Sequence, residues 1–140
     1  ESVTFLSNKN TIVDSILSGD YLKIKIGYSI SPDINFNDVI INIAIHDKEN
    51  YRITNFMSYE VKSQNIGEKN ILYLEIPSLM LKGGVYFIRW FASYKNTLKE
   101  NFLDDVSQAI SFNVIGTDYW QIGRVMDESN NAFFEAKYLF

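Results

Sequence analysis

The chain has 140 residues, of which 46% are apolar and 21% charged, and it contains no cysteine. This length fits one domain with an ordinary hydrophobic core, and the absence of cysteine excludes disulfides and cysteine-ligated metal sites. The net charge of −4 argues against a nucleic-acid-binding protein, which normally needs a basic surface. Every apolar run is much shorter than the roughly 18 residues expected of a membrane-spanning helix.

Short strands are predicted along most of the chain. Aromatic residues make up 15% of the sequence, and β-branched residues are abundant while alanine is rare, a composition that suits pleated sheets. Between residues 21 and 28, for example, apolar side chains alternate with Lys23 and Lys25. In chain order the predicted strands are 2–5, 11–16, 21–28, 39–47, 51–57, 71–76, 85–94 and 109–114.

The connections between these strands are predicted as turns and loops. Residues 98–106 are predicted as a loop with at most one helical turn, and residues 78–81 as a tight connection. Short strands joined by turns, without a long amphipathic helix, predict an antiparallel β-sandwich. The apolar segment at 133–140 needs a surface to cover it, so it either packs on its own sandwich or adds a strand to a partner.

Catalytic and cofactor-binding motifs are missing from the sequence. Its one histidine, His46, is not accompanied by a nucleophile motif, and no glycine-rich nucleotide-binding loop is present. The acidic pairs at 104–105 and 127–128 lack the spacing of a calcium-binding loop and are interpreted as solvated loop charges. We therefore predict a binding module without metal or cofactor, and not an enzyme.

Three segments resemble one known family in their order and spacing. They are Ser18-Gly19-Asp20 before an alternating strand, the stretch IPSLMLKGGVY at 76–86, and Ser111-Phe112-Asn113-Val114 in the closing strand. Together they are similar to the C-terminal carbohydrate-binding domain of Wzt-type subunits, the nucleotide-binding subunits of O-antigen polysaccharide ABC exporters. The resemblance covers residues 12–115, and Trp90 departs from it because the family usually has a smaller aliphatic residue there.

The resemblance implies an all-β, immunoglobulin-like sandwich that forms a homodimer, with its C-terminal strand exchanged. It divides the chain into a carbohydrate-binding sandwich at 1–115 and a dimerisation extension at 116–140 within the same domain. The implied partners are the O-antigen polysaccharide, whose non-reducing end is recognised, and the nucleotide-binding and membrane subunits of the exporter. The domain would then work in the cytoplasm at the inner membrane. Since the chain starts at Glu1 without methionine or signal peptide, we expect an ATPase domain to precede it.

Strand parity predicts a glycan-binding face. If Tyr86, Ile88 and Trp90 face the core, the side chains between them face outward, and so does Ser93. Outward-facing side chains of the neighbouring strands extend this face. Aromatic rings pack against sugars, amides bind hydroxyls, and arginine holds a carboxylate or phosphate. The predicted carbohydrate-binding residues are Asn42, His46, Arg52, Thr54, Phe87, Arg89, Phe91 and Asn113.

Other interpretations of these residues remain open. Phe87 and Phe91 also suit a dimer interface or a surface covered by the tail, and His46 suits an ordinary polar surface position. Trp90 is predicted in the core, and Tyr86 is predicted as a structural tyrosine whose hydroxyl bonds the backbone. The alternative function is a structural immunoglobulin-like module of a surface or fibre protein.

Overall fold

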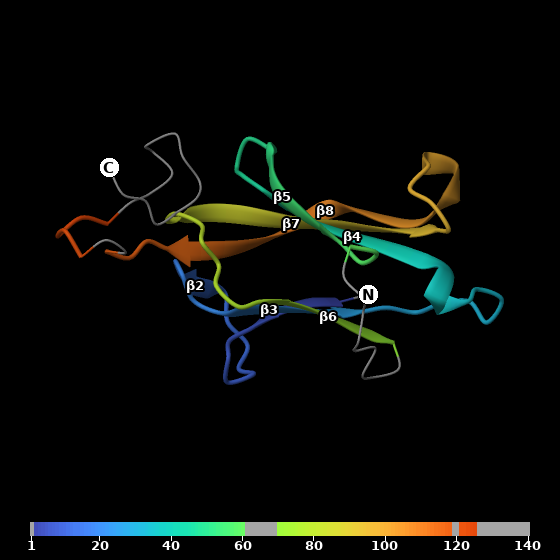
Figure 1. Cartoon of the computed structure of the whole chain (residues 1–140), viewed down its shortest axis with the longest axis horizontal. Helices are drawn as coiled ribbons and strands as arrows, with labels where there is room; N and C mark the ends of the chain where they lie inside the picture. The colour runs from blue at the N-terminus through green and yellow to red at the C-terminus, as the bar shows by residue number, and fades with distance from the viewer. Residues whose placement is uncertain (1, 61–69, 119–120, 126–140) are drawn as a thin grey trace.

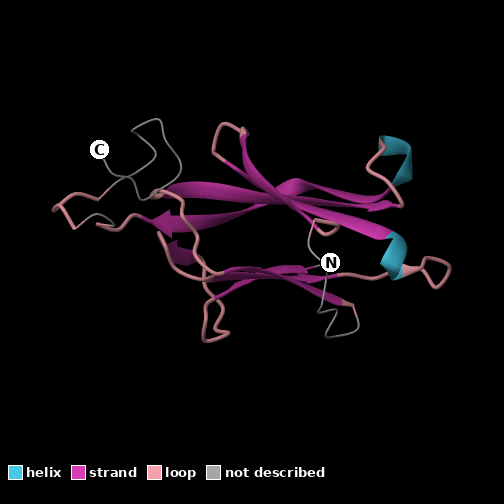
Figure 2. Cartoon of the chain, in the orientation of Figure 1, coloured by secondary structure: helices cyan, strands magenta, loops and turns pink. Residues whose placement is uncertain are grey.

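The computed structural model describes residues 2–60, 70–118 and 121–125, and for residues 106–109 only the backbone. Strands dominate it, and the two 3₁₀ turns η1 (Phe36–Asp38) and η2 (Lys99–Asn101) lie at one end (Figure 2). The strands are β1 (Ser2–Leu6), β2 (Ser15–Leu17), β3 (Leu22–Gly27), β4 (Val39–His46), β5 (Arg52–Met57), β6 (Ile71–Ile76), β7 (Gly84–Tyr94) and β8 (Phe102–Ile115).

The strands form two layers (Figure 1). A three-stranded sheet has the order β1–β3–β6, and a five-stranded sheet has the order β2–β8–β7–β4–β5. Neighbouring strands are antiparallel except for β2, which runs parallel to β8. The predicted all-β sandwich is therefore confirmed, with one parallel pair added.

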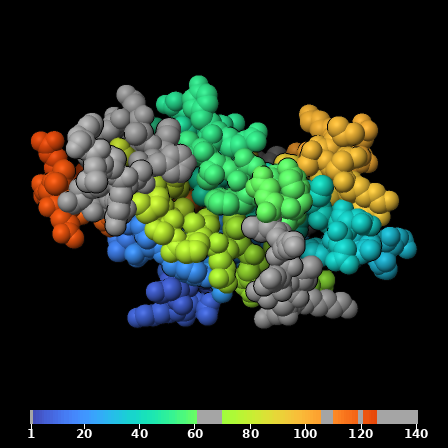
Figure 3. All heavy atoms as spheres, viewed as in Figure 1, coloured from blue at the N-terminus to red at the C-terminus, as the bar shows by residue number. Residues whose placement is uncertain are grey.

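The core fills the space between the layers and follows the alternation of the sequence. In β3, Leu22, Ile24 and Ile26 are buried while Lys23 and Lys25 face the other side. The segment between β6 and β7, yellow-green in the space-filling view, lies on the front of the molecule and contributes the buried residues Leu79 and Leu81 (Figure 3). Leu79 exchanges two backbone hydrogen bonds with the turn before β3, which ties this segment to the smaller sheet.

The strand β7 forms the middle of the five-stranded sheet. It pairs with β4 on one side and with β8 on the other, and Tyr86, Ile88 and Trp90 point into the core as predicted. The Tyr86 hydroxyl donates a buried hydrogen bond of 2.9 Å to the Lys82 carbonyl. This bond confirms the structural tyrosine and fixes the turn that leads into β7.

Two predicted boundaries are wrong. The second strand was expected at 11–16 but covers only Ser15–Leu17, because residues 7–10 form a turn after which Ile12 bridges back to Leu6. The last strand was expected at 109–114 but begins at Phe102, so the loop predicted at 98–106 is mostly strand. The acidic pair at 104–105 consequently lies within β8 and is not a pair of loop charges.

The exposure of Ser93 is a third difference. Ser93 was expected to face outward, and its pairing with Ile40 next to the Ala92–Ile41 pair keeps it on that side of the sheet, but it is fully buried. The apolar segment at 133–140 lies outside the described residues, as does any strand exchange that involves it. Within the described part of the chain, no helix has the length and apolar character needed to cross a membrane.

Replacing Tyr86 by phenylalanine tests the buried tyrosine bond. We expect Tyr86→Phe to lower the free energy of unfolding by about 1.5 kcal/mol, because the Lys82 carbonyl loses a buried donor. Urea denaturation followed by circular dichroism measures this change. The control Tyr51→Phe removes a hydroxyl from a side chain that is 67% exposed and should change stability much less. Equal effects of the two substitutions would contradict the role of the bond.

An ion pair on the outer side of the smaller sheet makes a small, pH-dependent contribution. Lys23 Nζ lies 2.9 Å from Glu75 Oε1, and this hydrogen bond lowers the pKa of Glu75 below 4.5 and raises the pKa of Lys23 above 10.5. The contribution of Glu75 to the free energy of unfolding is fully present above its ordinary pKa. It is lost as the pH falls through the lowered pKa of the folded protein. The contribution of Lys23 to the free energy of unfolding is fully present below its ordinary pKa. It is lost as the pH rises through the raised pKa of the folded protein.

We expect Glu75→Gln to destabilise the protein by about 0.5 kcal/mol at neutral pH, because the carboxylate is half-exposed and solvent screens the pair. Urea denaturation of both proteins from neutral to acidic pH measures the difference, which should vanish once Glu75 is protonated. A difference that stayed constant on acidification would show that the effect is not ionic.

Candidate functional site: the outer face of the five-stranded sheet

The side chains of β4, β5, β7 and β8 that point away from the core form one surface, which we call the outer face. The register places Phe91 beside Asn42, Arg89 beside Ala44, and Phe87 beside His46. On the far side of β4, Asn42 pairs with Met57, Ala44 with Asn55, and His46 with Arg52. On the far side of β7, Phe91 pairs with Asp105, Phe87 with Ser111, and Val85 with Asn113.

Aromatic rings occupy one part of the outer face. Phe91 stacks on Phe102, with ring centroids 4.6 Å apart and an interplanar angle of 11°. Arg89 separates Phe87 from Phe91 on this face of β7. Both phenylalanines are partly exposed. Such partly exposed rings offer flat apolar surfaces to a ligand.

The Arg89 guanidinium lies between these phenylalanines along β7. Among the residues that the structure describes, its buried Nε has no hydrogen-bond partner and Arg89 has no ion pair. In β8, Ile110 pairs with Ile88 and Val106 pairs with Trp90. The three residues 107–109 therefore lie opposite the single residue Arg89. A buried donor without an acceptor is costly, so this arginine is suited to a ligand that accepts hydrogen bonds.

The β4–β5 hairpin holds the polar end of the outer face. The Asp47 carboxylate accepts hydrogen bonds from the backbone N–H groups of Glu49 and Tyr51, at 3.0 and 2.7 Å, which shapes the hairpin turn. His46 Nδ1 lies 3.1 Å from the Asn50 carbonyl oxygen. The partly exposed His46 and the exposed Arg52 are therefore held side by side in register.

Most of the predicted site residues share this face, but Thr54 does not. A bulge between Ile45 and His46 places Thr54 in register with core-facing Ile45, whereas Arg52 pairs with outward-facing His46. Thr54 is thus on the opposite side of the sheet from the predicted face. Asn42 is on the predicted face but buried, and its amide N–H donates to Met57 Sδ on β5.

Sequence reasoning missed several members of the outer face. Asn55 and Met57 were missed because the bulge reverses the parity of β5, and Phe102 and Asp105 were missed because their segment was predicted as a loop. The sequence offered one signal for Phe102, an aromatic residue that follows the aromatic strand β7. Its spacing in the chain does not predict that it stacks on Phe91. No cluster of potential metal ligands is found among the residues that the structure describes.

The outer face therefore combines partly exposed rings, amides, an imidazole and two guanidinium groups.

A model of the Wzt C-terminal domain family matches residues 1–126. Comparison with curated proteins gives no match. Among solved structures, the fold is similar to one described as the crystal structure of the C-terminal domain of Wzt, with a TM-score of 0.67 and 12% identity over 99% of this chain and 80% of that chain. Because the family model matches most of its length, the chain belongs to the Wzt C-terminal domain family.

Proposed function

We propose that this chain is a non-catalytic carbohydrate-binding module that recognises the non-reducing end of a lipid-linked O-antigen polysaccharide. Membership of the Wzt C-terminal domain family is consistent with a carbohydrate-binding domain of an O-antigen ABC exporter. In this proposal, binding of the finished glycan is coupled to export by an ATPase domain elsewhere in the protein. The module would act in the cytoplasm, at the inner face of the inner membrane, with the other exporter subunits.

One observation carries the assignment of the binding site. The Arg89 guanidinium has a buried Nε that is unpaired among the described residues, and it is flanked on β7 by the partly exposed rings of Phe87 and Phe91. Sugars present apolar C–H faces and many hydroxyl groups, so a ring beside a planar guanidinium donor matches both parts of a sugar. A terminal carboxylate or phosphate would form the stronger, charge-assisted bond with Arg89.

The remaining residues extend this site. His46, Arg52 and Asn113 lie in the adjoining positions of the sheet and offer donors and acceptors for neighbouring hydroxyl groups. Asn42 and Thr54 are the weakest members of the predicted set, because Asn42 is buried and Thr54 is in register with a core residue. The proposed binding set is therefore centred on Arg89 and Phe91.

Single substitutions on the outer face test this function. We expect Arg89→Ala to weaken binding of the recognised O-polysaccharide about 10- to 100-fold, because a charge-assisted hydrogen bond is lost. Phe91→Ala should weaken it about tenfold through loss of the ring surface. An array of O-polysaccharides from several serotypes finds the ligand, and calorimetry measures the affinities of the variants.

Arg124→Ala is the matched control, since Arg124 is exposed outside the outer face. Circular dichroism confirms that each variant is folded. Wild-type affinity in both Arg89→Ala and Phe91→Ala would overturn the proposed site. Failure of the wild-type protein to bind any O-polysaccharide would favour the alternative, a structural immunoglobulin-like module.

We further infer that the extension at 116–140 mediates a homodimer. Leu17 and Ile115, which pair at the edge of the five-stranded sheet next to this extension, are 45% and 51% exposed. Exposed apolar side chains beside an apolar C-terminal sequence favour burial against a partner.

Deleting residues 116–140 should convert a dimer into an unstable or aggregating monomer, because apolar surface and a sheet edge lose their cover. Size-exclusion chromatography with light scattering measures the mass of both proteins. A dimer that persists after deletion would contradict the inference, as would a wild-type protein that is already monomeric.

A further inference from the structure

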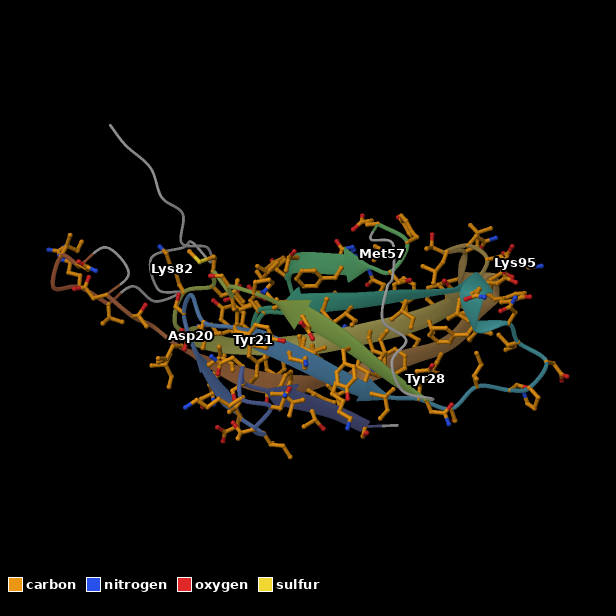
Figure 4. The ribbon with its side chains drawn as sticks, turned by 60° about the horizontal axis from the view of Figure 1, so that its bottom comes forward. Asp20, Tyr21, Tyr28, Met57, Lys82 and Lys95 are labelled. Carbon is orange, nitrogen blue, oxygen red and sulfur yellow. The ribbon has the colours of Figure 1, made fainter. Side chains whose placement is uncertain are left out.

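A cleft of about 240 Å³ opens between the two sheets at the end of the sandwich where β3 ends. Its walls come from both layers, with Ile26 and Leu72 from the smaller sheet and Ile41, Trp90 and Ala92 from the larger one. Figure 4 shows Tyr28, which also lines the cleft, at this end with Lys95, whereas Asp20 and Lys82 lie at the opposite end. Most of the lining residues of the cleft are therefore apolar.

Several lining residues of the cleft carry hydrogen-bonding groups. Tyr28 stacks on Phe36 of η1, with centroids 5.1 Å apart and an interplanar angle of 16°, and burial raises the pKa of the Tyr28 phenol, so it stays protonated. Ser29, Ser31 and Asp104 also line the cleft. Among the lining residues that the structure describes, Asp104 is the one with a charged side chain, and its carboxylate accepts hydrogen bonds while repelling anions.

We propose that this cleft binds the alkyl or acyl chain of a neutral amphiphile, with a hydroxylated head group held by Ser29, Ser31 and Asp104. An apolar protein cavity of about 150 Å³ is large enough to bind benzene, so the larger cleft here accepts a short chain. The carboxylate of Asp104 in the lining favours a neutral head over a carboxylate or phosphate.

This site is separate from the outer face. Trp90 and Ala92 line the cleft, whereas the intervening Phe91, and Arg89 before it, belong to the opposite side of the sheet. Binding in the cleft consequently does not depend on whether the outer face binds a glycan, and each site is tested without the other.

The test uses Trp90 as an internal reporter of the cleft. In a Trp120→Phe background Trp90 is the only tryptophan, and its fluorescence is followed while n-alkyl β-D-glucosides of increasing chain length are added as monomers. We expect the affinity to rise about fourfold with each added methylene until the cleft is full, as burial of that group predicts. Glucose alone should cause no change in Trp90 fluorescence.

Substitutions then locate the bound chain. Ala92→Leu fills the cleft and should weaken binding of octyl glucoside at least tenfold, whereas Ile12→Phe adds bulk at a residue that is 78% exposed outside the cleft and should leave it unchanged. Octanoate should bind the wild-type protein much more weakly than octyl glucoside, and Asp104→Asn should reduce this difference. Circular dichroism verifies the fold of each variant.

Several outcomes would overturn the proposal. Affinity independent of chain length in the wild-type protein would show that no alkyl chain is buried, and this result needs no variant. Equal binding of octanoate and octyl glucoside would contradict the selection of a neutral head. Unchanged binding by folded Ala92→Leu would place the amphiphile elsewhere.

Discussion

The two-residue period of β7, paired along both edges, is the constraint on which the rest of the molecule depends. Hydrogen bonding to β4 and β8 fixes the rotation of this strand, so adjacent side chains must enter opposite environments. Tyr86, Ile88 and Trp90 thereby join the core, and Phe87 and Arg89 are left on the outer face. A slip of one residue would bury the guanidinium and expose the core at the same time.

Irregularities in pairing set the limits of prediction from sequence. The parity of β7 was predictable because its apolar core positions recur without interruption from Tyr86 to Trp90. The orientation of Thr54 was not predictable, because the bulge beside Ile45 follows from how β5 fits its neighbour, and the sequence carries no glycine or proline to mark it. The β-sandwich and the core alternation of β7 were therefore predicted, while several members of the outer face were not.

The strand β8 shows a second limit. Two consecutive acids are typical of a loop, yet Asp104 and Asp105 extend the sheet because β7 supplies a long partner. Asp105 faces outward beside Phe91, and Asp104 lines the inter-sheet cleft at the open end of the sandwich. Position within the tertiary structure makes an inward-pointing acid tolerable there, and local propensity does not contain that information.

The parallel pair formed by β2 and β8 affects how the chain folds during synthesis. Ser15 lies opposite Asn113, so one of the first strands made waits for the last before its pairing is complete. Bringing these two strands together costs chain entropy. Hydrogen bonding in the ladder offsets this cost only after the strands have met, which slows folding. On the ribosome, the β4–β5 hairpin therefore forms before the larger sheet acquires its final edge, and the sandwich closes only after nearly all of its strands have emerged.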